Sequence, residues 1–376
     1  MSGELVTLSL CGDVMLGRGV DQVLPNPGDP ALLEGFIQDA GTYVRLAEAV
    51  NGPIPVPVDF SWPWGDALGV LEAFAPDVRV VNLETGVTRS EEFAPDKGVH
   101  YRMSPANLPC LAAVRPDVCV LANNHVLDFG RLGLEETLDA LAGAGLRVAG
   151  AGRDAAQARR PAIVPVRGGG RVLTFSMGTP SSGIPGTWAA TEDRSGVNHL
   201  EVLSDDVAAE VSGRMREMMR PGDVVVASVH WGSNWGYDVP EEQIRFAHAL
   251  IDGGVDVVHG HSSHHPRPIE VYRGKLVLYG CGDFIDDYEG ISGHAEYRDD
   301  LRLLYLVSVE SDTGRLAALR MAPFQARCMR LTHASAEDVE WLRAVLDRVS
   351  SGFGVRVETG EDGMLVPRSA SYVSRR

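Results

Sequence analysis

Short apolar runs along this chain alternate with stretches of helical periodicity, and the apolar runs end in polar residues. Aliphatic and β-branched runs predict strands, and apolar positions three and four apart predict amphipathic helices between them. A repeated order of strand, polar tip and helix indicates an α/β fold whose functional side chains lie at the carboxyl ends of the strands. The strands are predicted at residues 5–11, 78–83, 117–121, 223–229 and 255–258, and the clearest helices at 132–144 and 241–252.

The charge of the chain argues against several partners. Its 376 residues include 34 basic and 51 acidic side chains, which give a formal net charge of −17. A negative field of this size repels phosphate, so we expect no nucleic-acid partner. No apolar run reaches the roughly 18 to 20 residues of a membrane helix, and the first residues lack the basic region of a secretory signal. Five scattered cysteines fit a reducing compartment. We therefore expect a cytoplasmic protein without membrane contact.

Two proline- and glycine-rich stretches interrupt the alternation, at residues 25–63 and 178–198. Long irregular segments are often lids or recognition surfaces, although a surface insertion without function fits the same pattern. Further on, residues 301–325 have the alternation of antiparallel strands, and residues 335–350 have the spacing of a closing helix. Because no repeat or linker divides the chain, we predict a single domain over residues 1–376 with two insertions. The sequence does not determine the oligomeric state.

Side chains suited to metal binding and to proton transfer follow the predicted strands. Because the ends of neighbouring parallel strands meet at one edge of a sheet, these groups are expected to converge. Six of the eleven histidines lie between residues 230 and 265. Such a set suits a two-metal hydrolytic centre, and equally general acid–base catalysis without metal. The residues at the strand tips are Asp13, Asn82, Glu84, Asn124, His125, His230, His259, His261, His264 and His265.

Six segments around these tips carry a family resemblance: Gly12-Asp13-Val14-Met15-Leu16-Gly17-Arg18, Asn82-Leu83-Glu84, Ala122-Asn123-Asn124-His125-Val126-Leu127-Asp128-Phe129-Gly130, Val229-His230-Trp231-Gly232, Gly260-His261-Ser262-Ser263-His264 and Tyr279-Gly280-Cys281-Gly282-Asp283-Phe284. In this order they resemble the CapA (poly-γ-glutamate capsule protein) family over about residues 5 to 290. That family is similar to the calcineurin-type metallophosphoesterases. The resemblance implies an α/β fold with a four-layer α/β/β/α sandwich.

The same resemblance implies roles for individual residues. His125 takes the place of the residue that assists at the phosphoryl group. The chain departs from the metallophosphoesterase pattern at two positions. Metallophosphoesterases usually open with Asp-x-His, and this chain has Met15, a poor ligand for a hard metal ion, in place of that histidine. Glu84 replaces the usual bridging aspartate. Capsule-type members commonly carry a membrane anchor and this chain shows none, so we expect a function other than capsule export. The ligand-like positions are Asp13, Glu84, Asn124, His230, His261 and His264.

The missing histidine and anchor favour, as our leading hypothesis, a metal-independent peptide epimerase. The chain resembles the MslH-type lasso-peptide epimerases, which act without a cofactor on the C-terminal tryptophan of a ribosomal precursor peptide. Proton transfer at Cα needs acids, bases and a group that stabilises an enolate-like oxygen. One alternative is a metal-dependent phosphoesterase or poly-γ-glutamate/capsule-type polymer enzyme that binds Mn, Fe or Zn. A second is a peptide-binding module without catalysis. The proposed proton carriers are Asp13, Glu84, His125, His261 and His264, and the proposed oxyanion stabilisers are Asn124, His230 and Arg267.

Further residues are candidates for holding the substrate. We predict that the two insertions form an apolar groove leading to His230 and His261, because both contain or adjoin tryptophan. The alternative is that these tryptophans attach the insertion to the sheet. Arg267 is a candidate for binding a carboxylate, and the alternative is a solvated arginine. Cys281 is a candidate acid–base partner, and the alternative is a packed thiol. Asp283 is predicted to orient an imidazole. The substrate-binding candidates are Trp62, Trp64, Trp231, Arg267, Cys281 and Asp283, and Trp235 is a further candidate for lining the groove.

Overall fold

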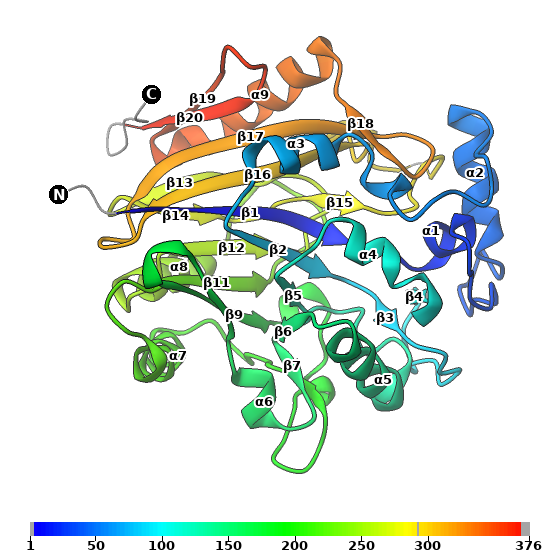
Figure 1. Ribbon diagram of the computed structural model, residues 1–376, viewed down its shortest axis with the longest axis horizontal. Helices are drawn as coiled ribbons and strands as arrows, with labels where there is room; N and C mark the ends of the chain where they lie inside the picture. Colours follow the sequence, from blue (N-terminus) through cyan, green and yellow to red (C-terminus); the bar gives the residue numbers. More distant parts are fainter. Residues whose placement is uncertain (1–3, 292, 370–376) are drawn as a thin grey trace.

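The computed structural model describes residues 4–291 and 293–369, and a mixed ten-stranded sheet with β1 near its centre forms one half of the fold (Figure 1). On one side of β1 the strands continue parallel, and on the other side they continue antiparallel. Two short strands lie off this path, because β15 (Asp283–Ile285) pairs with the end of β1 and β18 (Leu331–His333) pairs with β17. The strand order is β19 (Val355–Thr359), β20 (Leu365–Ser369), β17 (Leu316–Ala326), β16 (Leu301–Glu310), β1 (Leu5–Val14), β2 (Val78–Leu83), β5 (Val118–Val120) and β6 (Arg147–Ala149).

A second sheet of six strands faces the first. Its four central strands are parallel, and the two edge strands, β13 and β8, are antiparallel to their neighbours. The strand order is β13 (Ile269–Tyr272), β14 (Lys275–Leu278), β12 (Val257–His261), β11 (Val224–His230), β9 (Arg171–Gly178) and β8 (Ala162–Pro165). Two small ladders lie outside the sheets, between β3 (Gly86–Val87) and β4 (Arg102–Met103), and between β7 (Ala151–Gly152) and β10 (Gly196–Val197).

Helices cover the outer faces of both sheets. The outer side of the first sheet packs against α1 (Arg18–Val23), α2 (Gly41–Asn51), α3 (Ala67–Phe74), α4 (Pro109–Ala113) and α5 (Gly130–Gly143). The outer side of the second sheet packs against α7 (Asp205–Met218) and α8 (Glu241–Asp252), which lie beside β9 and β11 in Figure 1. The four-layer α/β/β/α sandwich implied by the resemblance is therefore confirmed. The remaining helices are α6 (Ala155–Arg159) beside β7 and α9 (Ala336–Ser350) beside β19.

Between the two sheets lies a core of small aliphatic side chains. Leu8 from β1, Val80 from β2, Val226 from β11 and Val257 from β12 are fully or almost fully buried there. Each such side chain contributes about 1.5 to 3 kcal/mol of transfer free energy when it is buried. The parallel strands are apolar on both faces because a second core covers their outer side. The continuous apolar runs of these strands are the sequence pattern from which the strands were predicted.

The predicted helices and C-terminal strands are also present. The helix predicted at residues 241–252 is α8, and α9 begins after Ser335, whose hydroxyl accepts a hydrogen bond from the Asp338 N–H at 3.2 Å. The predicted antiparallel strands are β16 and β17. None of the helices among the described residues has the length and apolar character needed to cross a membrane.

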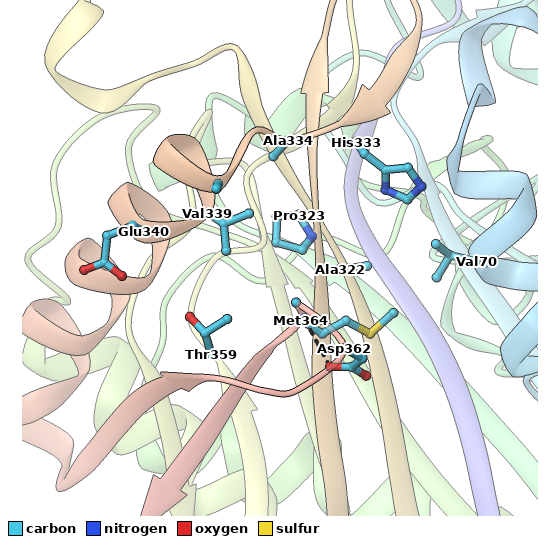
Figure 2. Close-up of a pocket in the computed structure, with 12 residues that line it drawn as sticks. Val70, Ala322, Pro323, His333, Ala334, Val339, Glu340, Thr359, Asp362 and Met364 are labelled. Carbon is cyan, nitrogen blue, oxygen red and sulfur yellow. Dashed lines mark hydrogen bonds between the residues drawn. The ribbon is translucent and has the colours of Figure 1, made fainter.

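A cavity of about 470 Å³ lies over the outer side of β17 (Figure 2). Val70 of α3, Pro323 of β17, Val339 of α9 and Met364 beside β20 point into it. Its described lining includes none of the strand-tip residues. The predicted strand-tip groups therefore lie outside this cavity.

Candidate functional site

The carboxyl ends of the central strands bring the predicted side chains together in the interior between the sheets. Asp13 on β1 lies in register with Asn82 on β2, and His230 on β11 lies in register with His261 on β12. The Asp13 carboxylate lies 4.0 Å from His261 Nδ1. All four side chains are buried. The structure thus brings these strand tips together, because the ends of β1 and β2 in the first sheet face the ends of β11 and β12 in the second sheet.

Two buried carboxyl groups share one amide donor in this cluster. Asn82 Nδ2 donates to Asp13 Oδ1 at 2.7 Å and to Glu84 Oε2 at 3.0 Å. Burial, and then the nearby Asp283 carboxylate, raise the pKa of Asp13 to about 7. Burial, and then Asp13, raise the pKa of Glu84 well above its usual range. Without a cation, the cluster therefore holds protons near neutral pH.

A chain of hydrogen bonds determines which nitrogen of His261 carries the proton. His259 Nε2 lies 2.8 Å from the Cys11 carbonyl, which only accepts, so His259 Nε2 donates and its Nδ1 accepts. Ser228 Oγ, 3.1 Å from that Nδ1, donates to it and accepts from His261 Nε2 at 2.8 Å. The Nδ1 atom of neutral His261 is therefore left with a bare lone pair.

His230, which faces His261, also has an Nδ1 atom without a proton. His230 Nε2 lies 3.0 Å from Asn124 Oδ1 and donates to it, so His230 Nδ1 also carries a lone pair. Burial lowers the pKa of both imidazoles well below the usual value, and nearby imidazoles lower each further. The two Nδ1 atoms are 2.7 Å apart. Two lone pairs that face each other beside a carboxylate form a place for a positive charge.

His125 is held from behind by a buried carboxylate. Its Nδ1 donates to Asp128 Oδ2 at 2.6 Å, and its Nε2 faces Glu84 Oε1 at 3.9 Å. Burial lowers the pKa of His125 to about 4, against the opposing effect of Asp128. Lys97 also contacts Asp128, and its ammonium lies 3.0 Å from His125 Nδ1. The arrangement presents a neutral imidazole with a free Nε2 to the site.

A further histidine, His264, lies close to Asp13. His264 Nδ1 lies 2.9 Å from Asp283 Oδ1, and its Nε2 lies 2.9 Å from the Asn234 amide. Burial opposes the charged form of His264, yet Asp283 and then Asp13 raise its pKa above the usual value. Trp235 packs against this imidazole, with ring centroids 5.2 Å apart. Asp283 thus occupies the predicted position beside an imidazole.

Two groups among the described residues have donor atoms close enough to hold a metal ion, and both include Asp13. The ligand atoms of each group lie within 4.8 Å of one another. The buried atoms Asp13 Oδ2 and Asp283 Oδ2 have no hydrogen-bond partner. Unpaired carboxylate oxygens and imidazole lone pairs fit a divalent cation. The two groups are Asp13, His230 and His261, and Asp13, His264 and Asp283.

Comparison with known proteins identifies the family. The family model "Bacterial capsule synthesis protein PGA_cap" matches residues 7–288. The chain belongs to this family. A "Probable polyglutamine synthesis accessory protein" of Mycobacterium tuberculosis is 55% identical over 363 residues, which cover 96% of each chain. The "PGA biosynthesis protein CapA" of Bacillus subtilis is 25% identical over 360 residues, which cover 96% of this chain and 82% of that protein.

The solved structures also include a similar chain. A crystal structure described as a novel phosphatase, from Mycoplasma pneumoniae, covers 85% of this chain and 94% of its own, with a TM-score of 0.41 and 11% identity.

The predicted tryptophan groove is wrong for the first insertion. Trp64 is completely buried, donates to the Cys110 carbonyl at 2.8 Å and packs against Phe284. Trp62 is half-buried and donates to the Cys328 carbonyl at 2.9 Å. These rings attach the insertion to the outer side of the first sheet. Part of the insertion is also regular, since α2 lies within residues 25–63.

Three other substrate-binding predictions are also wrong. Trp231 is completely buried in the core under α8 and donates to the Tyr279 carbonyl at 3.0 Å. Arg267 is buried and donates to the Asp238 carbonyl and to Gln243 Oε1, so it is neither solvated nor available to a carboxylate. Cys281 lies in the core between the sheets, and burial raises the pKa of its thiol well above the usual value. It is a packed thiol.

The second insertion does adjoin the site. At its start, the Thr179 N–H and the Ser182 hydroxyl donate to the His230 carbonyl. Trp188, in its middle, lies under the Lys97 ammonium, with 5.1 Å between the nitrogen and the ring centroid. Lys97 lies in a loop and was not among the predicted site residues. The sequence feature that could have identified Lys97 is its rarity, because lysine occurs only at positions 97 and 275 of this arginine-rich chain.

Proposed function

We propose that this protein is a metal-dependent hydrolase that cleaves amide bonds of a glutamate or glutamine polymer. The observation that carries the proposal is that His230 Nδ1 and His261 Nδ1 face each other at 2.7 Å beside Asp13, while Asn124 and Ser228 accept hydrogen bonds from the two Nε2 atoms. Neutral imidazoles cannot hydrogen-bond to each other through two lone pairs, whereas both can bind one divalent cation.

The roles of the side chains follow from their positions. Asp13, His230 and His261 would hold the cation, and the half-buried Asn124 lies next to them with Oδ1 on His230. A divalent cation bound there would polarise a substrate carbonyl and lower the pKa of a water molecule. His125 presents a free Nε2 toward the cluster while Asp128 holds its Nδ1–H. We therefore assign His125 as the group that accepts the proton of the attacking water and passes it to the departing nitrogen.

The relatives support the choice of polymer. The family is described as a capsule synthesis protein, and the two relatives are named for polyglutamine synthesis and for PGA biosynthesis. Two-metal sites hydrolyse amide bonds in aminopeptidases as well as phosphate esters in phosphatases. The donor set is therefore compatible with hydrolysis of a polymer of amide-linked residues.

The test measures metal and amide cleavage on one preparation. Protein purified without chelator is incubated with poly-γ-glutamate, poly-α-glutamate and polyglutamine, and new amino groups are counted. We expect cleavage of at least one polymer, its loss on treatment with EDTA and its return with Mn²⁺. His261→Ala should lose the metal and reduce the rate by about 100-fold or more, whereas His333→Ala, at an exposed position of β18, should change neither. Unchanged cleavage by protein shown to be free of metal contradicts the proposal.

The peptide-epimerase hypothesis stays a prediction, and one observation favours it. The Asp13 carboxyl, whose pKa burial raises to about 7, lies 4.0 Å from Nδ1 of the neutral His261 imidazole, so a proton donor and a proton acceptor are side by side. Metal-free protein is incubated in D₂O with a peptide that ends in tryptophan. Deuterium at Cα of that residue would favour the epimerase over the hydrolase. Its absence, together with polymer cleavage by the metal-loaded protein, would exclude it.

A further inference from the structure

Tyr288 lies at the edge of the buried cluster of strand-tip residues, shortly after the end of β15. Its ring packs edge-on against His264, with ring centroids 5.3 Å apart and planes at 90°. Its hydroxyl donates to the sulfur of Met15 at 3.7 Å. Met15 follows Asp13 by two residues, and its N–H donates to the Ile285 carbonyl at 2.7 Å, beside the pairing of β1 with β15. The Tyr288 hydroxyl therefore lies next to the strand end that carries Asp13.

Two buried ion pairs fix the backbone that carries Tyr288. Asp286 pairs with Arg302, and Asp287 accepts from Arg18 Nε at 3.0 Å; all four side chains are buried. The Tyr288 N–H donates to Asp286 Oδ1 at 3.0 Å. Moving this segment would leave buried charges unpaired, which is strongly unfavourable. The hydroxyl is thus held in place before a substrate arrives, as a group that stabilises charge in a transition state must be.

The hydrogen bond that the Tyr288 hydroxyl donates is a weak one, because a thioether sulfur is a poor acceptor. A substrate oxygen is a stronger acceptor, so the hydroxyl can exchange the Met15 sulfur for it. The hydroxyl keeps its proton at neutral pH, since the ordinary pKa of tyrosine is about 10. Tyr288 is half-buried and borders a cavity of about 230 Å³ whose described lining includes Asp299 and Arg302, whereas Met15 is completely buried. Tyr288 therefore has both a free donor and access from the surface.

We propose that Tyr288 is a further catalytic residue, whose hydroxyl stabilises the negative oxygen that forms when water attacks the substrate amide. The proposal rests on the proposed function, because the amide and the attacking water belong to that reaction. As the oxygen of water bonds to the carbonyl carbon, the electron pair of the C=O bond moves onto the carbonyl oxygen. The Tyr288 O–H donates a hydrogen bond to this oxygen and keeps its proton. When the carbonyl forms again, the bond from carbon to nitrogen breaks, and the nitrogen takes its proton from His125.

The test compares Tyr288→Phe with the wild type on poly-γ-glutamate, poly-α-glutamate and polyglutamine. Phenylalanine keeps the ring that packs against His264 and removes only the hydroxyl. We expect kcat to fall about 100-fold, the effect of removing one donor to such an oxygen, while KM and the amount of bound metal stay unchanged. The control is Tyr297→Phe, which removes the hydroxyl of another half-buried tyrosine, packed on His265 with ring centroids 4.5 Å apart. This control should keep kcat.

The outcomes separate this proposal from the proposed function. Cleavage by the wild type with the same kcat in Tyr288→Phe would overturn the role of Tyr288 and leave the hydrolase in place. Loss of metal from Tyr288→Phe, or a change in KM as large as the change in kcat, would also overturn it, since the residue would then only support the site. A wild type that cleaves none of the three polymers would overturn both proposals. A kcat about 100-fold lower in Tyr288→Phe, with KM, metal and the control unchanged, supports the catalytic role.

Discussion

At the scale of single residues, Asp128 illustrates how the site is held. Burial alone raises the pKa of a carboxyl, but His125 and then Lys97 lower the pKa of Asp128 below its usual value. It also accepts the Tyr101 N–H at 2.6 Å. Because the folded pKa lies below the unfolded one, the stabilisation is present above about pH 4 and is lost as the pH falls through the folded pKa.

We therefore predict that Asp128→Asn lowers the free energy of unfolding by about 1 to 3 kcal/mol at pH 7, since it leaves the half-buried Lys97 ammonium without its counter-charge. The difference between variant and wild type should shrink at pH 3. Urea denaturation at both pH values measures it. Asp139→Asn, a mostly exposed carboxylate paired with Arg153, serves as the control and should change little. An equal difference at both pH values would contradict the assigned charge state.

The residues at strand tips were predictable because an apolar run that stops at a polar residue indicates the end of a strand. Asp13, His230 and His261 follow this rule, and the structure brings them together. Trp231 directly follows His230 and yet packs in the core under α8, away from the site, because successive strand residues point to opposite faces of the sheet. Residue type alone does not say which face a side chain takes. Lys97 was missed because a loop residue carries no such periodic signal.

At the scale of elements, substitutions of the tryptophans in the two insertions are expected to have opposite effects on stability and on KM. Trp64→Ala should lower the free energy of unfolding by about 3 to 5 kcal/mol, because it removes a fully buried ring. Its KM for polymer should not change. Trp188→Ala should raise KM several-fold and change stability little, because the half-buried ring lies under Lys97 beside the site. Thermal unfolding and kinetics on the same preparations measure both. A raised KM for folded Trp64→Ala would restore the groove hypothesis for the first insertion.

Long apolar runs and helical periodicity made most elements predictable from the sequence, whereas very short elements were not. β2 and α8 have the residues predicted for them. β15 has only three residues, and its pairing with β1 depends on contact between segments about 270 residues apart. No local pattern encodes such a contact, and it is the contact that places Asp283 beside Asp13. The part of the site that the sequence could not supply is thus the part built by long-range pairing.

At the scale of the whole molecule, the charge of −17 bears on the choice of polymer. A polyglutamate chain is a polyanion, and a strongly negative protein repels it over a distance set by ionic strength. The Debye length is about 30 Å at 0.01 M salt and about 10 Å at 0.1 M. Polyglutamine is neutral and experiences no such repulsion. Cations held by buried carboxylates reduce the repulsion only locally.

Salt should therefore distinguish the two polymers as substrates. We predict that KM for poly-γ-glutamate falls several-fold between about 0.01 and 0.1 M salt, while KM for polyglutamine stays constant and kcat is unchanged for both. The physical reason is that screening removes long-range repulsion during encounter but leaves the buried cluster of Asp13, His230 and His261 unaffected, because all three side chains are buried. Steady-state kinetics in a series of NaCl concentrations at constant free Mn²⁺ measures this. A KM for poly-γ-glutamate that rises with salt would mean that a local positive surface, rather than the net charge, governs how the polymer approaches.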